Sequence, residues 1–488
     1  MRSYLLVFAV AGLVTALWMP VLMRLGARLG ALDNTRTPPV PRMGGWAIFL
    51  GGAIALLLVG VVFDPTGNTL LGAPESLGPV VAGTAAILLL GAVDDIHPLH
   101  ARLKFALQIA IAFGVWLAGV RIDLVSAPFG ILALGPVVSA AVTVLWLVGI
   151  TNAFNLLDGA DGVAAGSAFF AATAVFVMSV ALGHPAIGLI AVALAGALLG
   201  FLPFNFPPAR AFLGDGGSHV AGFLLAGLAV EGSTKGPTLV AIAVPLVAFA
   251  VPVFDTTITL LRRRVRGRPL FERDESHVHH RLAQIGYSPR RVAGLIYVAS
   301  AVVAVLSMLF LNPSARSYAV GLIVIGAGLW LTARHLRLHE LNELARLAHQ
   351  GVLQPRRIAM NVSLRRAAER LEHIERFQDF LEGVALLVEG AGFDEVGVLA
   401  FVGTDRRGNA KSWRLEGERF EPGRVPRSHD EWEVVCPFEG QGWTGELRLR
   451  RRLGRARLLL DFNLLLDVVQ PALTAAAQRV DATAVASA

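Results

Sequence analysis

The sequence has 488 residues, of which 55% are hydrophobic and only 16% are charged, and its mean hydropathy is +0.61. A soluble domain carries about 25% charged residues, so this composition excludes a chain that lies wholly in water. The single cysteine excludes a disulfide framework and a zinc cluster built from thiolates. The net charge of +7 would suit nucleic acid, but in a membrane protein excess Lys and Arg marks cytoplasmic loops. We therefore predict a polytopic membrane protein with no nucleic-acid partner.

Charged residues divide the chain into two parts at about residue 334. From Arg334 onward 45 of 155 residues are charged, against 34 of the first 333. We therefore predict a multi-span membrane domain over residues 1–333, a helical linker over 334–380 and a cytoplasmic α+β domain over 381–488. The expected fold class is an all-α polytopic membrane protein with this α+β domain at its C-terminal end.

Apolar segments of nearly bilayer length recur through the first part, and each predicts a transmembrane helix. The first segment is followed directly by Arg24 and Arg28 and lacks a small-residue cleavage site, so we interpret it as a retained span rather than a signal peptide. The sequence predicts about eleven spans: Leu5–Met23, Trp46–Phe63, Pro79–Val93, Phe105–Val120, Leu132–Gly149, Val163–Leu182, Ala186–Phe204, His219–Val230, Leu239–Leu261, Val292–Leu311 and Tyr318–Ala333.

The basic residues between the spans gather on one side of the membrane. Connections after odd-numbered spans contain sixteen Lys and Arg residues, whereas the N-terminus and the connections after even-numbered spans contain four. The positive-inside rule therefore places the sixteen in the cytoplasm. The N-terminus is then outside, and the C-terminal tail is inside.

Five loops on the predicted cytoplasmic side contain nearly all the polar residues with a purposeful spacing. A random scatter would place such residues on both faces, so their gathering on one face indicates a single site. In chain order the loops hold Pro41–Gly45 with Arg42; Asp94-Asp95 with Arg102 and Lys104; Thr151–Gly162 with Asn152, Asn155, Asp158 and Asp161; Asn205–Ser218 with Phe212 and Asp215; and Arg273-Asp274 with His277, His279, His280 and Arg281.

Carboxylates and amides dominate these loops. The pair Asp94-Asp95 ends an apolar span and therefore needs a compensating proton or cation, which Lys104 or a hard divalent ion could supply. Oxygen donors without cysteine favour Mg²⁺, with Mn²⁺ as the alternative, over zinc. The remaining carboxylates could instead bind a base or a sugar, or accept a proton. Glycines in the same loops let backbone N–H groups approach a phosphate.

Each loop alone has a plainer interpretation. The Asp94-Asp95 pair could be solvated, and a glycine-rich loop is often only a turn. The histidine run of the fifth loop could bind nickel or zinc, or have no role. We interpret Asp255 and His219 as structural. The prediction of a site depends on five loops converging on one face.

Together, these motifs resemble those of the polyprenyl-phosphate N-acetylhexosamine-1-phosphate transferases, the membrane enzymes that begin bacterial cell-wall and surface-polysaccharide synthesis. The resemblance covers about residues 1–330. The residues that carry it are Asp94-Asp95 with Ala101-Arg102-Leu103-Lys104, Asn152-x-x-Asn155-x-x-Asp158-Gly159-x-Asp161-Gly162, Asn205-x-Pro207-Pro208-Ala209-Arg210 leading to Gly214-Asp215, and His277-Val278-His279-His280-Arg281-Leu282.

The resemblance implies an Mg²⁺-dependent phosphoglycosyl transfer. The phosphate of a polyprenyl phosphate, usually undecaprenyl phosphate, attacks the β-phosphorus of a UDP-sugar, UMP leaves, and the lipid carries a diphosphate-linked sugar. Phosphoryl transfer needs a metal across the diphosphate and cationic donors for developing charge, which agrees with the residue types of the loops. The implied partners are the UDP-sugar, the polyprenyl phosphate and the surrounding membrane lipid.

The resemblance also implies roles at the reacting phosphates. Asp215 and Asn155 are the expected Mg²⁺ ligands, and Lys104 would neutralise a phosphate. Asp94 and Asp95 resemble a pair that positions or deprotonates the lipid phosphate. Because that phosphate is already mostly ionised at neutral pH, we expect positioning to matter more than base catalysis.

The nucleotide and the sugar have their own expected residues. Asp158 would contact the uracil, and Phe212 would stack on it. Asn152 and, in the loop bordering the cleft, Arg42 complete the substrate-binding set, while Asp161 is counted with the catalytic residues. The expected contacts to the diphosphate or sugar are His277, His279, His280 and Arg281.

The fifth-loop pattern His-x-His-His-Arg-Leu resembles the GlcNAc-1-phosphate branch of the family, so UDP-GlcNAc is the expected donor. Another UDP-N-acetylhexosamine or UDP-MurNAc-pentapeptide is the alternative. The implied location is the bacterial inner (plasma) membrane, with the active site and the C-terminal domain in the cytoplasm. Dimers occur among such enzymes, so a homodimer is an open expectation.

The tail lies outside this resemblance. Helical spacing of Arg, Glu and Leu over 334–380 precedes four β-like runs, Glu395–Val402, Ser412–Phe420, Glu431–Pro437 and Trp443–Arg450, and an apolar helix near Leu458–Val480. This order predicts helix, antiparallel sheet and helix. Ligand sensing and docking or oligomerisation both remain open for the tail.

Two other classes compete with the transferase. A transporter of an anionic or lipid-linked sugar should place ionisable residues at mid-span, whereas here they cluster at span ends. The other class is an inactive relative in which only the tail has a function. The acidic residues of the motifs are all present, which argues against this class.

Overall fold

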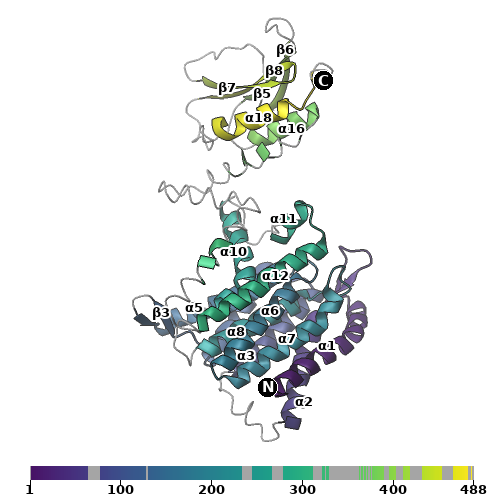
Figure 1. The fold of residues 1–488 in the computed structure, drawn as a ribbon, viewed down its shortest axis with the longest axis vertical. Coiled ribbons are helices and arrows are strands. Elements are labelled where there is room, and N and C mark those ends of the chain that lie inside the picture. The colour runs from purple at the N-terminus through teal and green to yellow at the C-terminus, as the bar shows by residue number, and fades with distance from the viewer. Residues whose placement is uncertain are drawn as a thin grey trace. The chain divides into compact units, whose positions relative to one another are not determined.

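A computed structural model describes residues 2–63, 77–127, 130–233, 245–265, 278–311, 376–388, 395–402, 410–417, 431–452 and 465–481, together with isolated residues between 321 and 374 and residue 485. The chain forms two compact units (Figure 1). One contains residues 1–259 and 273–332, and the other contains residues 260–272 and 333–488.

The first unit is a bundle of helices. Its helices are α1 (Arg2–Leu29), α2 (Gly44–Phe63), α3 (Leu77–Ile96), α4 (Ala101–Leu117), α5 (Pro136–Leu157), α6 (Val163–Ala181), α7 (Pro185–Asn205), α8 (Gly214–Ser233), α11 (Val278–Gln284) and α12 (Pro289–Ser307), which a 3₁₀ turn (Met308–Leu311) follows. The helix α10 (Ala250–Val265) begins in this unit and continues into the other one after Thr259. Two antiparallel hairpins join neighbouring helices: β1 (Leu32–Asp33) with β2 (Val40–Pro41), and β3 (Leu124–Ala127) with β4 (Gly130–Ala133).

Six of the described helices, α1, α3, α5, α6, α7 and α12, are long and apolar enough to cross a membrane. Two others contain shorter apolar stretches, Gly44–Gly60 in α2 and Ala250–Leu260 in α10. This confirms a mostly helical membrane protein but not the count of eleven spans. Of the expected span Tyr318–Ala333 the structure describes only isolated residues between 321 and 328, so this span stays a prediction.

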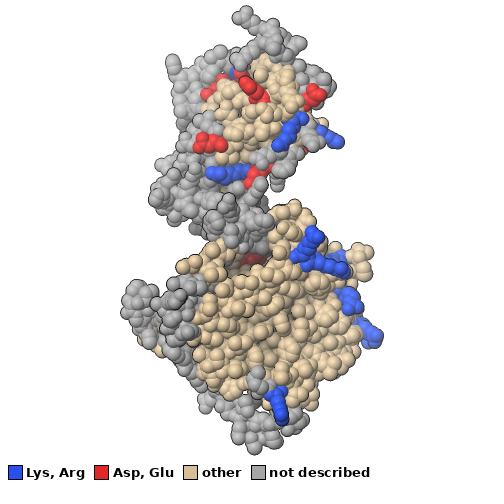
Figure 2. All heavy atoms as spheres, in the orientation of Figure 1, with Lys and Arg blue, Asp and Glu red and all other residues tan. Residues whose placement is uncertain are grey.

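The outer surface of the bundle is apolar. Leu57, Leu145 and Val305 are 68%, 73% and 70% exposed, which would be costly in water but is favourable against lipid. The face of this unit that Figure 2 shows is mostly free of charged side chains, and Lys and Arg lie near its edges.

Small residues let the helices of the bundle approach closely. A Cβ added at Gly12 of α1 would lie 3.0 Å from the Gly196 carbonyl oxygen of α7, and one added at Gly200 would collide with the Gly12 backbone. Small residues at such crossings bring helix backbones together, which is how helices associate in lipid without a hydrophobic driving force.

The second unit has a four-stranded antiparallel sheet in the order β6-β5-β8-β7. Its strands are β5 (Glu395–Val402), β6 (Ala410–Gly417), β7 (Glu431–Gly440) and β8 (Trp443–Arg452). All four overlap the predicted runs, β5 with the same bounds; β6 begins earlier than expected, and the last residues of its predicted run, 418–420, lie outside the described residues.

Two helices pack on this sheet, α16 (Phe377–Val388) and α18 (Gln470–Ala477), the latter preceded by a π-helical turn (Leu465–Val469). Phe380 packs against Phe438 and Trp443, with ring centroids 5.5 and 6.1 Å away. Cys436 is buried in the same core as a free thiol. The described helical residues 465–477 lie within the predicted Leu458–Val480, whose first residues, 458–464, are outside the described part of the chain. The helix α16 crosses the domain boundary placed at residue 380.

Candidate active site

Lys104 connects carboxylates from two other helices. Its Nζ donates to Asp94 Oδ2 at 3.0 Å and also to Asp215 Oδ2. Asp94 lies in the last turn of α3, Lys104 in the first turn of α4, and Asp215 in the first turn of α8. One ammonium between two carboxylates leaves this group with a net negative charge, which attracts a further cation.

Asp95 faces the N-terminus of α8 instead of Lys104. Its Oδ1 accepts from the Asp215 N–H at 3.0 Å, and its Oδ2 accepts from the Gly216 N–H at 3.0 Å. A carboxylate in this place satisfies free N–H groups and complements the helix dipole. The two adjacent aspartates therefore have different surroundings: Asp94 is paired with a lysine, and buried Asp95 caps the helix that carries Asp215.

Glycines bring three helix backbones together at the same place. A Cβ added at Gly45 of α2 would lie 2.5 Å from the Gly217 nitrogen, and one added at Gly91 of α3 would lie 2.5 Å from Gly216 Cα. At Gly214 the backbone has φ +71°, a left-handed conformation that favours glycine. The first turn of α8, with Asp215, is thus held by direct backbone contact.

Asn155, near the end of α5, also reaches Asp215. Its Nδ2 donates to Asp215 Oδ1 at 3.1 Å and to Ser218 Oγ at 3.0 Å. As a metal ligand Asn155 would have to present its amide oxygen, so a bound ion would require this side chain to turn over. The structure brings both predicted ligands together, but as a hydrogen-bonded pair.

The donor set fits Mg²⁺ in its chemistry. Among the described residues no group of three or more His, Cys, Asp or Glu side chains forms a metal cage. Mg²⁺ usually takes only one or two carboxylates together with substrate phosphates, so a complete protein cage is not required. Asp215 and the Asn155 amide supply hard oxygen donors, and the ammonium of Lys104 already occupies a place for a cation between Asp94 and Asp215.

Asn152 belongs to a buried chain of polar side chains that ends near the cluster. Its Nδ2 donates to Gln108 Oε1 at 2.7 Å, and Gln108 Nε2 lies 3.1 Å from His219 Nε2. His219 is fully buried on α8, one turn beyond Asp215. Asn152 is thereby engaged in helix packing, and His219, interpreted as structural, takes part in the same chain.

Asp158 directly follows α5. Burial raises its pKa well above the usual carboxyl range, and the negative charges of Asp215 and Asp95 act in the same direction. A carboxyl group that keeps its proton can donate as well as accept a hydrogen bond. This suits the expected contact with the edge of a pyrimidine base.

Asp161 is paired with a residue of the first loop. Arg36 NH1 donates to Asp161 Oδ2 at 3.0 Å, and Arg36 NH2 donates to Oδ1 at 2.6 Å. The Ala209 N–H also donates to Oδ2, at 2.9 Å. The Arg36 guanidinium lies over the Phe212 ring, 5.1 Å from its centre.

The third and fourth loops are tied to each other and to α12. Asn205 Oδ1 accepts from the Gly162 N–H at 3.1 Å, and the Tyr297 hydroxyl donates to the Gly162 carbonyl at 2.9 Å. Arg290 Nε donates to the Pro207 carbonyl at 3.0 Å. These contacts from α12 fix the loops that carry Asp158, Asp161 and Phe212.

The first loop joins the fourth through its backbone. The Phe212 N–H donates to the Pro41 carbonyl at 2.9 Å, and the Gly44 N–H donates to the Phe212 carbonyl at 3.0 Å. Arg42 itself points to Asp33, with 3.3 Å between its NH2 and Asp33 Oδ2. The loop borders the predicted site as expected, but in the structure Arg42 is engaged by an aspartate of its own hairpin.

The fifth loop is described only in part. His277 lies outside the described residues, and His279 and His280 are described only as backbone in α11. Arg281 in the same helix is buried. The placement of these side chains relative to the other site residues stays a prediction.

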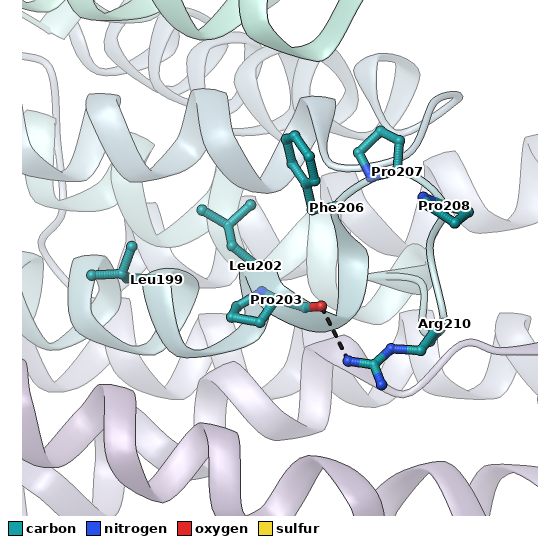
Figure 3. Close-up of a pocket in the computed structure, with 7 residues that line it drawn as sticks. All are labelled: Leu199, Leu202, Pro203, Phe206, Pro207, Pro208 and Arg210. Carbon is teal, nitrogen blue, oxygen red and sulfur yellow. Dashed lines mark hydrogen bonds between the residues drawn. The ribbon is translucent and has the colours of Figure 1, made fainter. Parts of the chain in front are cut away.

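A cavity of about 570 Å³ lies beside the site residues and contains none of them. It is lined by the last turns of α7 and the following loop, with Leu202, Phe206 and Pro207 among the apolar walls and Arg210 at one side (Figure 3). Arg210 NH2 donates to the Pro203 carbonyl at 3.4 Å, and its guanidinium covers the Phe204 ring at 5.4 Å. Because none of the predicted site residues lines this cavity, we assign no role to it.

Sequence reasoning missed four residues that organise the site: Arg36, Gln108, Asn205 as a hydrogen-bonding residue, and Tyr297. Arg36 was visible only as one of the basic residues of a cytoplasmic loop. Gln108 and Tyr297 sit inside apolar segments, where a lone polar residue is a weak signal that a partner lies across the bundle.

Comparisons with known proteins agree with this arrangement. The profile of glycosyl transferase family 4 matches residues 77–233, which include α3 to α8. A probable undecaprenyl-phosphate N-acetylglucosaminyl 1-phosphate transferase of Bacillus subtilis is 35% identical over 298 residues, covering 60% of this chain and 80% of the relative. A decaprenyl-phosphate N-acetylglucosaminephosphotransferase of Mycobacterium tuberculosis is 35% identical over 365 residues, covering 67% of this chain and 87% of the relative. A phospho-N-acetylmuramoyl-pentapeptide-transferase of Staphylococcus aureus is 30% identical over 317 residues, covering 60% of this chain and 94% of the relative.

Proposed function

Because this chain belongs to the polyprenyl-phosphate N-acetylhexosamine-1-phosphate transferase family, we propose that it transfers GlcNAc-1-phosphate from UDP-GlcNAc to undecaprenyl phosphate. The products are UMP and a lipid diphosphate that carries the sugar. This would be the first membrane step of cell-wall or surface-polysaccharide synthesis. The names of the relatives support the reaction class and the polyprenyl-phosphate acceptor.

One observation supports the proposal most directly: the Asp94–Lys104–Asp215 group at the adjoining ends of α3, α4 and α8. Two carboxylates and an ammonium at the edge of an apolar bundle can bind a cation, which in turn holds charged phosphate groups where a lipid acceptor and a water-soluble nucleotide can both arrive. A transporter would need such residues at mid-span instead.

In the proposed reaction an oxygen of the lipid phosphate attacks the β-phosphorus of the donor. The bond between this phosphorus and the bridging oxygen breaks, and UMP leaves with that oxygen and its electron pair. Lys104 would neutralise charge on the transferring phosphate, and Asp94 would orient the Lys104 ammonium. Asp95 would keep the first turn of α8, and thus Asp215, in place.

Mg²⁺, which we propose as the cofactor with Mn²⁺ as the alternative, would supply Lewis-acid neutralisation of the diphosphate when bound. Asp215, with the Asn155 amide, would hold it. Asp158 would contact the uracil edge. His277, His279, His280 and Arg281 would face the diphosphate or sugar.

We further propose that the site and the C-terminal domain are cytoplasmic, in a bacterial inner membrane protein with about eleven crossings. The basic connections after odd-numbered spans support this orientation. A homodimer is an additional proposal. Residues 334–380 as linker and 381–488 as a separate domain complete the proposed organisation.

The decisive experiment uses purified protein in detergent with undecaprenyl phosphate, Mg²⁺ and a panel of UDP-sugars, and it measures UMP release and lipid product. We expect product from UDP-GlcNAc that disappears with EDTA, returns with Mg²⁺, and is lost in Asp215→Ala. Product from another UDP-sugar alone would correct the donor. No product from any donor, in protein that keeps the melting behaviour of a folded chain, would refute the transferase.

A further inference from the structure

Arg36 is exposed on one side and anchored on the other. Its side chain is 44% exposed, whereas that of Asp161, its bidentate partner, is 5% exposed. The guanidinium uses two of its five N–H groups on this carboxylate, so three remain for another acceptor. The exposed part of the Arg36 side chain is therefore accessible to a ligand from solution.

Asp161 has little capacity left for chemistry of its own. Oδ1 accepts from Arg36, and Oδ2 accepts from both Arg36 and the Ala209 N–H. A carboxylate engaged in this way is poorly placed to take a proton or to bind a metal. It fixes the orientation of the guanidinium instead, because the two parallel N–H···O bonds define the plane of the fork.

The fixed guanidinium lies next to the nucleotide region of the proposed site. It covers the Phe212 ring at 5.1 Å, and Phe212 precedes Asp215 by three residues. The backbone of Phe212 is held by Pro41, in the same hairpin as Arg36. An arginine whose plane is already set by a carboxylate and an aromatic ring loses little freedom when it binds an anion.

We propose that Arg36 binds phosphate oxygens in the diphosphate of the nucleotide donor, and that Asp161 positions Arg36 for this contact. This inference rests on the proposed function for the identity of the donor. It assigns a substrate contact to the first loop and changes Asp161 from a catalytic residue to one that acts through Arg36. The same chemistry could bind the lipid phosphate, so the test separates the two sources.

The test compares Arg36→Gln, Arg36→Lys and Asp161→Asn with Arg210→Gln as a matched control. Arg210 is also an arginine over a phenylalanine ring, but it donates only to a backbone carbonyl. Two steady-state series measure KM for UDP-GlcNAc and KM for undecaprenyl phosphate. We expect Arg36→Gln to raise the donor KM at least about tenfold, as the loss of a charge-assisted hydrogen bond implies, with the acceptor KM unchanged. Arg36→Lys should restore part of the affinity, and Asp161→Asn should raise the donor KM in the same direction. Arg210→Gln should match the unchanged protein.

A second measurement needs no turnover. The full chain is titrated calorimetrically with UDP and with uridine. Arg36→Gln should bind UDP more weakly than the unchanged protein does, and it should bind uridine with the same affinity. Equal losses for both ligands would mean that the loop has rearranged, and an effect on the acceptor KM alone would place Arg36 at the lipid phosphate; either overturns the proposal. If the unchanged protein forms no product but binds UDP with this dependence on Arg36, the proposed function fails while the anion site stands.

Discussion

Replacing Asp95 by asparagine tests whether this residue acts as a cap or as a chemical group. The side chain keeps its size, but only one oxygen remains to accept from the Asp215 and Gly216 N–H groups, both at 3.0 Å in the structure. The other carboxylate oxygen is replaced by an NH₂ group, which faces a backbone N–H donor and cannot accept from it. One charge-assisted hydrogen bond is lost, and a buried N–H is left unsatisfied.

The expected cost follows from these two contacts. A lost helix cap costs about 0.5–2 kcal/mol, and an unsatisfied buried donor costs about 1–3 kcal/mol. Part of this is offset because a buried carboxylate carries a desolvation penalty that the amide lacks. We therefore expect Asp95→Asn to lower the free energy of unfolding by about 2 kcal/mol, the upper part of the range for a cap.

The assay is unfolding of the protein in mixed micelles with increasing SDS, followed by circular dichroism, beside UMP release under standard conditions. Asp94→Asn is the matched variant, because Asp94 pairs with Lys104 instead of capping α8. We expect Asp94→Asn to keep stability within about 1 kcal/mol and to lose most activity. Full stability of Asp95→Asn together with complete loss of turnover would refute the capping argument and assign Asp95 to the chemistry.

Three further predictions concern other parts of the chain. Tyr297→Phe removes the hydroxyl that donates to the Gly162 carbonyl at 2.9 Å, so it should cost about 1 kcal/mol in the same SDS unfolding assay and lower kcat modestly; unchanged values would show that this bond does not hold the loop. Burial raises the pKa of the Cys436 thiol to about 11, so below that pH the reactive thiolate is scarce in the folded state. A thiol reagent at pH 8 should therefore label this only cysteine at least about tenfold faster after unfolding in urea, and equal rates would contradict its burial. Gly45→Ala places a Cβ 2.5 Å from the backbone of α8 and should cost about 3 kcal/mol or prevent folding, whereas Gly78→Ala, which meets no atom within 4 Å, should fold normally by size-exclusion chromatography.

The parts of the fold that follow from local patterns were predictable. Long apolar runs predicted the membrane helices, and alternating runs predicted the four strands of the second unit. Element ends were less accurate, as in β7 and β8, which run to Gly440 and Arg452 instead of the predicted Pro437 and Arg450, because strand ends depend on pairing partners that local spacing does not contain.

The candidate site was predictable as a set of loops but not as a set of contacts. Asp94 and Asp95 are neighbours in sequence, yet adjacent helical positions point in different directions, and only the packing of α8 against α3 decides which one becomes a cap. The Arg36–Asp161 pair joins residues 125 positions apart, so no local pattern could reveal it. A motif identifies which residues meet, whereas the tertiary structure decides which atoms they share.

The glycine contacts around α8 limit what protein engineering can change. Gly45, Gly91 and Gly217 leave no room for a side chain where α2, α3 and α8 meet. A library aimed at a new donor sugar would lose folded protein at these positions before it sampled any new specificity. Diversity is better placed at residues 34–39 in the hairpin of Arg36, which are exposed.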